Sequence, residues 1–346
     1  MKKIVIHRPG SYDKLTLEES KTSSPGENEL LISVRFVGVN YADCMVRMGL
    51  YESAKKYVGW PITPGFEVSG VVEQVGSCVS GWEVGDEVMA VTRFDGYSSH
   101  VVVPAHQVFS VPDGFSLAEA AGFPTIFLTA YYAMFALAHP RKNLRMLVHS
   151  AAGGVGGALL QLAKIAEAFC VGVVGRSHKV EIAQKLGADH VIDKSKEPLW
   201  PTAEAHSPDG YHVIFDANGV ATIGESYNHL ASPGKLVIYG FHTMIPKKGG
   251  RPNWFKLAWD YLRTKRFDPL AMTGENRSVL AFNLSYLFSE REILEDAMGD
   301  LLRWASEGKL QPPPIQIYPF EEVARAHEDI ESAQTVGKLI LEVDHS

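Results

Sequence analysis

A glycine-rich turn joins two regular elements near the middle of the chain. The strand-like run Leu144–His149 leads into Ser150-Ala151-Ala152-Gly153-Gly154-Val155-Gly156-Gly157, and a helix-like run, Val155–Ala168, follows at once. A pyrophosphate needs backbone N–H groups at a helix start, and only residues without bulk let it approach that closely. We therefore predict a dinucleotide site at Ala152, Gly153, Gly154 and Val155. The spacing is not a strict G-x-G-x-x-G, so a tight turn without a ligand is the alternative.

The end of the next strand bears on which dinucleotide binds. It reads Val173-Val174-Gly175-Arg176-Ser177-His178-Lys179, with no carboxylate between Glu167 and Glu181. A site for NAD usually has a carboxylate there for the ribose 2′-hydroxyl, whereas a 2′-phosphate favours cations. The pattern predicts NADPH, bound at Gly175, Arg176, Ser177 and Lys179. The alternative is that the cations only solvate a helix start, and Asp193 in the following strand works against NADPH unless Lys194 compensates.

The elements around these residues have two different rhythms. From Lys3 to about Phe109 the chain shows short β-type runs such as Leu30–Val37, Val68–Val75 and His100–Val103. Strand and helix patterns then alternate: Leu144–His149, Val155–Ala168, Cys170–Val174, His178–Leu186, Tyr211–Asp216, Ala221–Leu230 and Lys235–Gly240. Alternation of this kind predicts a doubly wound parallel sheet. The fold class is therefore α/β with an additional β-rich domain, and Val323–Glu331 and Gly337–Val343 are a closing helix and strand.

Composition excludes several classes of function. A chain of 346 residues has room for two domains, and its net charge of −7 offers no field that would attract nucleic acid. No apolar run has the length of a signal peptide or a membrane span. Cys44, Cys78 and Cys170 are far apart and odd in number, which argues against disulfides. We expect a cytoplasmic protein without nucleic-acid partners.

Several motifs, in order, resemble the zinc-free quinone oxidoreductases of the medium-chain dehydrogenase/reductase superfamily. They include Gly38-Val39-Asn40-Tyr41-Ala42-Asp43, Gly49-Leu50-Tyr51, Pro64-Gly65-Phe66-Glu67, the glycine-rich turn, Leu128-Thr129-Ala130-Tyr131 and Val336-Gly337-Lys338. Within that family the chain resembles the vesicle amine transport protein homologues. The resemblance implies a GroES-like catalytic domain at 1–120 and 286–346, a Rossmann NADPH-binding domain at 121–285, and a homodimer.

The resemblance also suggests roles for individual residues. Zinc-dependent relatives have Cys where this chain has Asn40 and His where it has Phe66, so no catalytic zinc is expected. The nicotinamide pocket would be lined by Asn40, Tyr51 and Thr129. Tyr51 is the first candidate for a proton donor and Asn40 a second catalytic residue, although aromatic packing and a turn hydrogen bond are their structural alternatives. Further cofactor contacts would come from Asn218, Gly240, Phe241 and Phe282. Asp43 is interpreted as a structural carboxylate near a helix start.

Together these features predict NADPH-dependent, zinc-independent reduction of quinones or α,β-unsaturated carbonyls by hydride transfer. Two alternatives stay open. An enoyl-thioester reductase would share the fold and the lack of zinc, and an NADPH-binding sensor or lipid-associated protein would bind the dinucleotide with little turnover. Measurement of turnover separates an enzyme from a sensor, and a substrate panel separates the two reductases.

One basic, aromatic segment is not used by these functions. Pro246–Phe267 has seven cations and one carboxylate, mixed with two Trp, one Tyr and two Phe. It could form an amphipathic helix that contacts an anionic membrane without inserting stably. The alternative, which we favour from the sequence, is a helix whose aromatic residues pack on the cofactor domain or a dimer partner while its cations face water.

Overall fold

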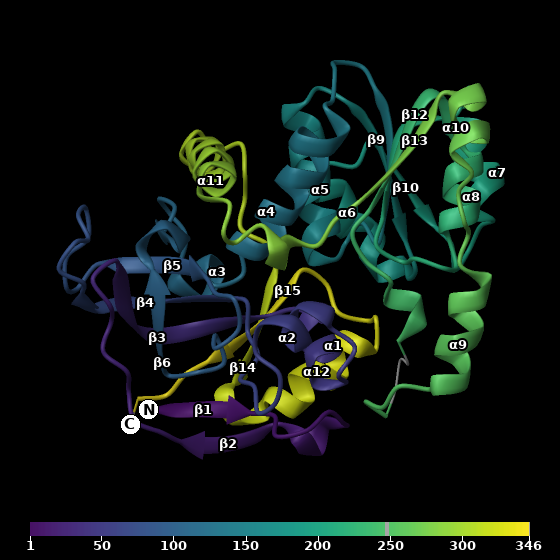
Figure 1. Cartoon of the computed structure of the whole chain (residues 1–346). Coiled ribbons are helices and arrows are strands. Elements are labelled where there is room, and N and C mark those ends of the chain that lie inside the picture. Colours follow the sequence, from purple (N-terminus) through teal and green to yellow (C-terminus); the bar gives the residue numbers. More distant parts are fainter. Residues whose placement is uncertain (246–248, 346) are drawn as a thin grey trace. The chain divides into compact units, whose positions relative to one another are not determined.

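The computed structural model describes residues 1–245 and 249–345 (Figure 1). Of these, 1–128, 249–251 and 284–345 form one compact unit, called here the terminal unit because it contains both chain ends. Residues 129–245 and 252–283 form the second, central unit. Pro246, Lys247 and Lys248, which belong to the predicted basic segment, lie outside the described residues.

The terminal unit is built on a mostly antiparallel sheet. The strand order is β14-β15-β3-β4-β5-β7, with β6 also paired to β3, and only β14 and β15 are parallel. The strands are β3 Glu29–Val39, β4 Glu67–Val75, β5 Glu87–Val91, β6 His100–Pro104, β7 Val108–Ser110, β14 Ile315–Pro319 and β15 Lys338–Glu342. A separate antiparallel pair joins β1 Lys2–Val5 to β2 Thr16–Glu19. The last strand, β15, thus completes a sheet that the first third of the chain begins.

Apolar β-branched side chains fill the core of this unit. Val34, Val37, Val68 and Val88 are fully buried there, as expected for strands that turn one face inward. The helices are α1 Tyr41–Arg47, α2 Glu52–Tyr57, α3 Leu117–Ala120, α11 Arg291–Ser306 and α12 Val323–Glu331, with 3-10 turns η1 Tyr12–Lys14, η2 Ala105–Gln107, η6 Leu284–Tyr286 and η7 Phe320–Glu322. The predicted closing helix has the same bounds as α12.

The central unit contains a six-stranded, fully parallel sheet. The strand order is β10-β9-β8-β11-β12-β13. The strands are β8 Arg145–His149, β9 Phe169–Val174, β10 His190–Asp193, β11 Tyr211–Asp216, β12 Leu230–Ile238 and β13 Arg277–Ala281. The order runs outward from β8 in one direction and from β11 in the other, so the strand order reverses between these two neighbours. The doubly wound fold predicted from the alternating pattern is confirmed.

Helices cover both faces of this sheet. Figure 1 shows the sheet between α5 and α6 on one side and α7, α8 and α10 on the other. Their bounds are α5 Gly154–Ile165, α6 Val180–Leu186, α7 Leu199–His206, α8 Ile223–Asn228, α9 Trp254–Arg263 and α10 Pro269–Glu275, with 3-10 turns η4 Ser177–Lys179 and η5 His242–Met244. Helix α4 Pro124–Tyr131 continues into a π-helix, η3 Tyr132–Ala138. No helix in the described part of the chain is long and apolar enough to cross a membrane.

One predicted boundary is wrong. The sequence suggested a helix to Leu230 and a strand from Lys235, but β12 already begins at Leu230. Leu230 pairs with Tyr211, and the ladder shifts register before Lys235 pairs with Val213. Pro233 and Gly234 resemble a turn in the sequence, whereas the sheet accommodates them as an irregularity within one strand.

Candidate active site

Most of the predicted cofactor residues gather at one edge of the central sheet. Parallel strands end at the same edge, which is where ligands bind in open α/β sheets. The segments that directly follow five of the strands contain these residues: Ala152, Gly153, Gly154 and Val155 after β8, Gly175, Arg176, Ser177 and Lys179 after β9, Asn218 after β11, Gly240 and Phe241 after β12, and Phe282 after β13. The structure therefore brings twelve of the predicted residues to the carboxyl edge of the sheet. Thr129 lies apart from them in sequence, on α4.

The loop between β8 and α5 has the features of an anion site. Ser150 has a positive φ of 54°, and Gly153 N–H donates to Ser150 O at 2.9 Å. A Cβ on Gly156 would lie 2.3 Å from Ser150 O, so this position requires glycine. Gly153 is the N-cap of the twelve-residue α5, and no side chain caps it. The first N–H groups of α5 are thus left for a ligand rather than for a capping side chain.

Asp216, at the end of β11, organises the neighbouring loop. Its Oδ1 accepts hydrogen bonds from Asn218 N at 2.8 Å, Gly219 N at 3.0 Å and Thr222 Oγ1 at 2.9 Å. Its Oδ2 accepts from Ser226 Oγ at 2.9 Å. Asp216 is fully buried, so these donors replace water around the carboxylate. Asp216 was predicted only as the last residue of a strand, because a carboxylate at a strand end has no motif of its own.

The loops after β8, β11 and β12 are linked through Asn218. Ser150 Oγ donates to Asn218 Oδ1 at 3.1 Å, which connects the glycine-rich loop to β11. Thr243 N and Oγ1 both donate to Asn218 O, at 3.0 and 2.7 Å. Gly219 has a φ of 82°, and a Cβ there would lie 2.5 Å from Phe241 Cδ1. Asn218 and Phe241 are therefore held in one hydrogen-bonded and packed arrangement.

One of the predicted phosphate residues, Ser177, is hydrogen-bonded to a carboxylate. Burial, and secondarily Arg176, lowers the pKa of Lys179 to about 8. Ser177 Oγ donates to Asp193 Oδ2 at 2.6 Å, and hydrogen bonds from Ser177 and Ser195 lower the pKa of Asp193. The hydroxyl of Ser177 is thus already used as a donor to an ionised Asp193, and Arg176 and Lys179 place positive charge in the same segment after β9.

Asn40 belongs to a buried polar cluster in the terminal unit. Lys338 Nζ lies 2.5 Å from Asn40 Oδ1 and 2.6 Å from Glu67 Oε1, and the Lys338 and Glu67 side chains are at most 4% exposed. Asn40 Nδ2 donates to Glu67 Oε1 at 2.9 Å and to Gly38 O at 3.3 Å. Both amide hydrogens are therefore used, and Oδ1 already accepts from Lys338. Thr125 N donates to Glu67 Oε2 at 2.8 Å, which completes the cluster.

This cluster does not fit a catalytic zinc. Phe66 has no ligand atom, and its ring packs between those of Tyr51 and Phe94, with centroids 5.5 and 5.3 Å away. The carboxylate of Glu67 and the amide oxygen of Asn40 already bind the ammonium group of Lys338. A catalytic zinc needs three protein ligands, and a cation here would meet the charge of Lys338. Tyr51 is the N-cap residue of α2, and its ring packs on that of Phe66.

Asp43 has the structural role predicted for it. It is the third residue of α1, and its Oδ2 accepts from Asn40 N at 2.7 Å while its Oδ1 accepts from Gly65 N at 2.9 Å. Burial raises its pKa to about 7, against the lowering effect of these hydrogen bonds and of Lys338. Asp43 thus fixes both Asn40 and the Gly65–Phe66 turn.

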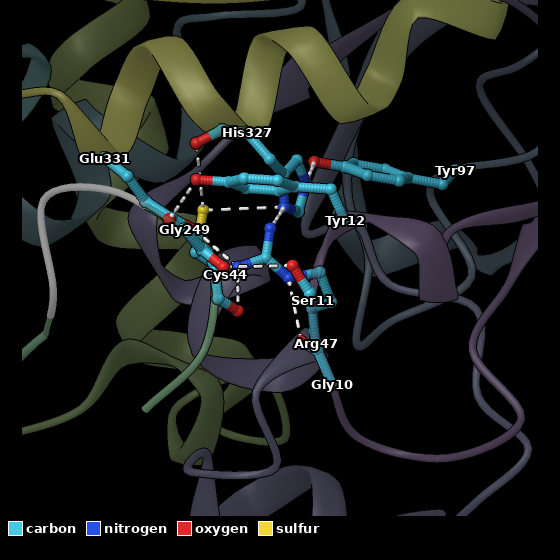
Figure 2. A network of polar contacts seen from close by, with 10 residues as sticks. Gly10, Ser11, Tyr12, Cys44, Arg47, Tyr97, Gly249, His327 and Glu331 are labelled. Atoms are coloured by element: carbon cyan, nitrogen blue, oxygen red, sulfur yellow. Dashed lines mark hydrogen bonds and ion pairs between the residues drawn. The ribbon is translucent and has the colours of Figure 1, made fainter. Parts of the chain in front are cut away.

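A second buried network surrounds Arg47 (Figure 2). Arg47 Nη2 donates to Glu331 Oε1 at 2.6 Å, and both side chains are 0% exposed. Arg47 Nη1 lies 3.4 Å from His327 Nδ1, and Tyr97 Oη lies 3.0 Å from His327 Nε2. Because a guanidinium can only donate, Nδ1 is the acceptor and Nε2 carries the proton. Burial first, and then Arg47, holds the pKa of His327 well below its usual value.

The same network contains three groups that could ligate a metal. Ligand atoms of Cys44, His327 and Glu331 lie within 4.8 Å of one another. The guanidinium of Arg47, however, already contacts both His327 and Glu331 and supplies the positive charge. The network is better described as an internal ion pair with hydrogen-bonded neighbours than as a metal site. The network was not predicted from the sequence, since its members come from three distant segments.

A separate hollow lies at the opposite edge of the central sheet. Its volume is about 190 Å³, and its lining includes Gly210, Tyr211, Leu230 and Arg277 at the amino ends of β11, β12 and β13. None of the predicted cofactor or catalytic residues lines it. The carboxyl edge, rather than this hollow, is the candidate site in the central unit.

Comparisons with known proteins match the two kinds of domain. Residues 26–113 match the alcohol dehydrogenase GroES-like domain family, and residues 186–341 match the zinc-binding dehydrogenase family. The chain is 34% identical to the synaptic vesicle membrane protein VAT-1 homolog of Danio rerio, over 98% of this chain and 69% of the relative. It is 32% identical to the human VAT-1 homolog, over 98% and 85% of the two chains.

Solved structures give the same result. Escherichia coli quinone oxidoreductase complexed with NADPH is similar with a TM-score of 0.85 and 27% identity, covering 99% of this chain and 100% of the other. Human VAT-1 homolog-like protein has a TM-score of 0.84 and 28% identity, over 100% and 99%. These matches confirm the GroES-like and Rossmann architecture. The chain therefore belongs to the medium-chain dehydrogenase/reductase superfamily of oxidoreductases, in the quinone oxidoreductase family together with the VAT-1 homologues.

Proposed function

We propose that this chain is an NADPH-dependent oxidoreductase that reduces quinones or α,β-unsaturated carbonyls without zinc. The observation that carries the proposal is the carboxyl edge of the central sheet. There an uncapped helix start, the Asp216-supported loop and the cations after β9 offer separate contacts for a pyrophosphate, a ribose and a 2′-phosphate.

Relatives of known activity support this choice of chemistry. The quinone oxidoreductase of Escherichia coli was solved with NADPH. A 2-haloacrylate reductase of Burkholderia is 28% identical over 97% of both chains, and its substrate name denotes an α,β-unsaturated acid. An enoyl reductase with 26% identity and a TM-score of 0.85 is a further structural neighbour, so enoyl thioesters belong in the substrate test.

Each site residue has a proposed task toward the dinucleotide. Arg176 and Lys179 bind the 2′-phosphate as cations, and the start of α5 binds the pyrophosphate. Bound NADPH supplies the hydride, and one proton from the protein or water completes the reduction. The remaining contacts along the cofactor come from Thr129, Ala152, Gly153, Gly154, Val155, Gly175, Ser177, Asn218, Gly240, Phe241 and Phe282.

Asn40 and Tyr51 are proposed to act at the reacting end. The amide hydrogens of Asn40 are both bonded within its cluster, so Asn40 is proposed to accept a hydrogen bond from the cofactor rather than to donate one to the substrate oxygen. Tyr51 is proposed as the donor to that oxygen, where charge develops as the hydride arrives. A homodimer that acts on a small molecule is part of the same proposal.

The test is NADPH oxidation by the purified, metal-free protein with a naphthoquinone, a simple enone and an enoyl thioester. We expect turnover with at least one acceptor and a preference for NADPH over NADH of about tenfold or more, equivalent to about 1.4 kcal/mol. Arg176→Met with Lys179→Met should remove the preference. Lys185→Met is the matched control, because Lys185 is an exposed cation paired with Glu181 on the adjoining helix. Tight NADPH binding without oxidation of any acceptor would refute the reductase and favour a sensor.

A further inference from the structure

Helix α9 and the end of α2 both expose aromatic side chains. On α9, Trp254 and Trp259 are 66% and 60% exposed, and it is Lys256 that contacts the rest of the central unit, by donating to Thr243 O at 2.5 Å. The packing of these rings on the cofactor domain, expected from the sequence, is therefore wrong for the described residues. On α2, the last residue, Tyr57, is 41% exposed, and this second surface adjoins the residues proposed for the reacting end.

Two tyrosine rings and two cations form one cluster on the terminal unit. The rings of Tyr57 on α2 and Tyr286 on η6 have centroids 5.9 Å apart. Lys56 Nζ lies 5.3 Å from each of these two centroids, and the guanidinium carbon of Arg93 lies 4.7 Å from that of Tyr57. Cations over ring faces are held in place by the negative charge of those faces. We call Lys56, Tyr57, Arg93 and Tyr286 the cation–tyrosine cluster.

The positive charge of this cluster has no counter-ion among the described residues. Neither Lys56 nor Arg93 forms an ion pair within 1–245 and 249–345, whereas the neighbouring Lys55 pairs with Glu52 at 3.5 Å. Arg93 Nη2 donates to Ser289 Oγ at 2.6 Å, but Arg93 Nε is buried and has no hydrogen-bond partner in the same ranges. A buried donor without a partner is costly, so it marks a place where a ligand gains affinity. The cluster thus offers a preformed site for an anion.

The cation–tyrosine cluster lies beside the rings at the proposed reacting end. Phe66 packs between Tyr51 and Phe94, and each of these two rings is connected through the chain to one cation. Tyr51 precedes α2 and Tyr57 ends it, so about 9 Å of helix separates their backbones. Arg93 is the residue directly before Phe94, whose ring is buried. An acceptor that reacts near Tyr51 therefore has the cluster within reach of its far end.

These properties define a class of substrate. We propose that the cation–tyrosine cluster binds an anionic group at the far end of the acceptor, so that the protein selects quinones or enones that bear a sulfonate, carboxylate or phosphate. This inference rests on the proposed reductase function. Lys56 supplies a point charge, and the guanidinium of Arg93 donates to the anion from its free Nε. Such an anion occurs both on a small acidic acceptor and on the phosphate-bearing arm of a coenzyme A thioester.

Two matched pairs of acceptors test the proposal and separate these two sources. A naphthoquinone with a sulfonate on its second ring is compared with the unsubstituted naphthoquinone, and crotonyl-coenzyme A with crotonyl-N-acetylcysteamine, which has no phosphate. The readout is the ratio of kcat/KM for the anionic member to that for the neutral member. Intrinsic differences in reactivity cancel when this ratio is compared between protein variants.

Lys56→Met with Arg93→Met should lower this ratio at least about tenfold in one pair, mainly by raising KM for the anionic member, and high salt should lower it in the wild type. Lys55→Met is the matched control, because Lys55 is an adjacent cation that is already paired, and it should leave the ratio unchanged. Lys56→Met alone removes only an exposed side chain and should lower the ratio about threefold, which keeps the test valid if loss of Arg93 reduces the melting temperature.

Equilibrium binding separates this inference from the proposed function. The probe is 2-naphthalenesulfonate, which cannot accept a hydride, and calorimetry in the presence of NADPH measures its affinity. If no acceptor is reduced but this affinity falls about tenfold in the double variant and not in Lys55→Met, the reductase is wrong and the anion site is supported. The inference is overturned if the double variant changes neither the kcat/KM ratio of either pair nor the affinity for the probe, or if Lys55→Met lowers them as much.

Discussion

Replacement of Arg47 by methionine should destabilise the terminal unit more than any change to a surface ion pair. The variant keeps much of the side-chain volume but leaves the Glu331 carboxylate buried without its cation. Breaking such a pair costs about 3–5 kcal/mol. Arg47 also donates to Gly10 O at 3.3 Å and Gly250 O at 3.2 Å, so further buried acceptors lose a partner. We expect a loss of at least about 4 kcal/mol.

Urea unfolding, followed by circular dichroism, measures this loss directly. A second variant, Arg47→Met with Glu331→Leu, removes both charges and should recover part of the stability, because two neutral groups need no counter-ion. The recovery is incomplete, since Tyr12 Oη loses the Glu331 acceptor that lies 2.7 Å away. Arg303→Met is the surface control, with Arg303 half-exposed beside Asp300, and should leave the midpoint unchanged. A loss below about 1 kcal/mol for Arg47→Met, in a protein with wild-type spectra, would contradict the reasoning.

Three further predictions follow from the site geometry. Because the pKa of Lys179 is lowered to about 8, its positive charge is lost as pH rises from 7 to 9. The affinity for NADPH, measured by fluorescence titration, should fall over this pH range while the affinity for NADH stays level. A similar fall in Lys179→Met would show that deprotonation of Lys179 is not the cause. Asp216→Asn should weaken NADPH binding about tenfold, or some 1.4 kcal/mol, because an amide N–H then faces donors that need an acceptor. Isothermal titration calorimetry measures this change. Unchanged affinity with a normal melting temperature would show that the loop after β11 keeps its conformation without the Asp216 carboxylate. The pKa of His327 in the folded chain is below 6.5, so below pH 6.5 the unfolded chain binds a proton that the folded chain does not, and the free energy of unfolding falls by up to about 1.4 kcal/mol per pH unit. The urea midpoint should therefore fall less between pH 7 and 5 in His327→Gln than in the wild type. An equal fall in both proteins would show that His327 does not cause the pH dependence.

Local sequence patterns predicted the central unit well. Strands of a parallel sheet are buried on both faces and read as continuous apolar runs, and the glycine-rich turn occurs where a strand meets a helix. Tyr211–Asp216 was predicted with its actual bounds, since turn residues flank it on both sides. Residues after the strand ends could be grouped in advance, because parallel strands share one carboxyl edge.

The buried polar networks could not be predicted in the same way. Arg47 and Glu331 are 284 residues apart, and each reads locally as an ordinary charge on the polar side of a helix. Glu67 and Lys338 were noticed only within family motifs, and nothing in either motif shows that their side chains meet at Asn40. Helix α9 was found from its composition, but which face turns toward solvent depends on the contacts of Lys256 with residues outside the helix.

The position of β15 has a consequence for how the chain is synthesised. Residues 129–283 contain every strand of the central sheet and, apart from a short segment that includes 249–251, belong to the central unit, so this unit can fold while translation continues. The terminal unit cannot be completed then, because β3 gains its neighbour β15, and Asn40 and Glu67 gain Lys338, only when residues 338–342 emerge. A ribosome stalled shortly before residue 338 would therefore hold a folded central unit beside an open sheet edge and an uncompensated carboxylate. Nascent chains of this protein should recruit chaperones to the early β segments until the last strand is added.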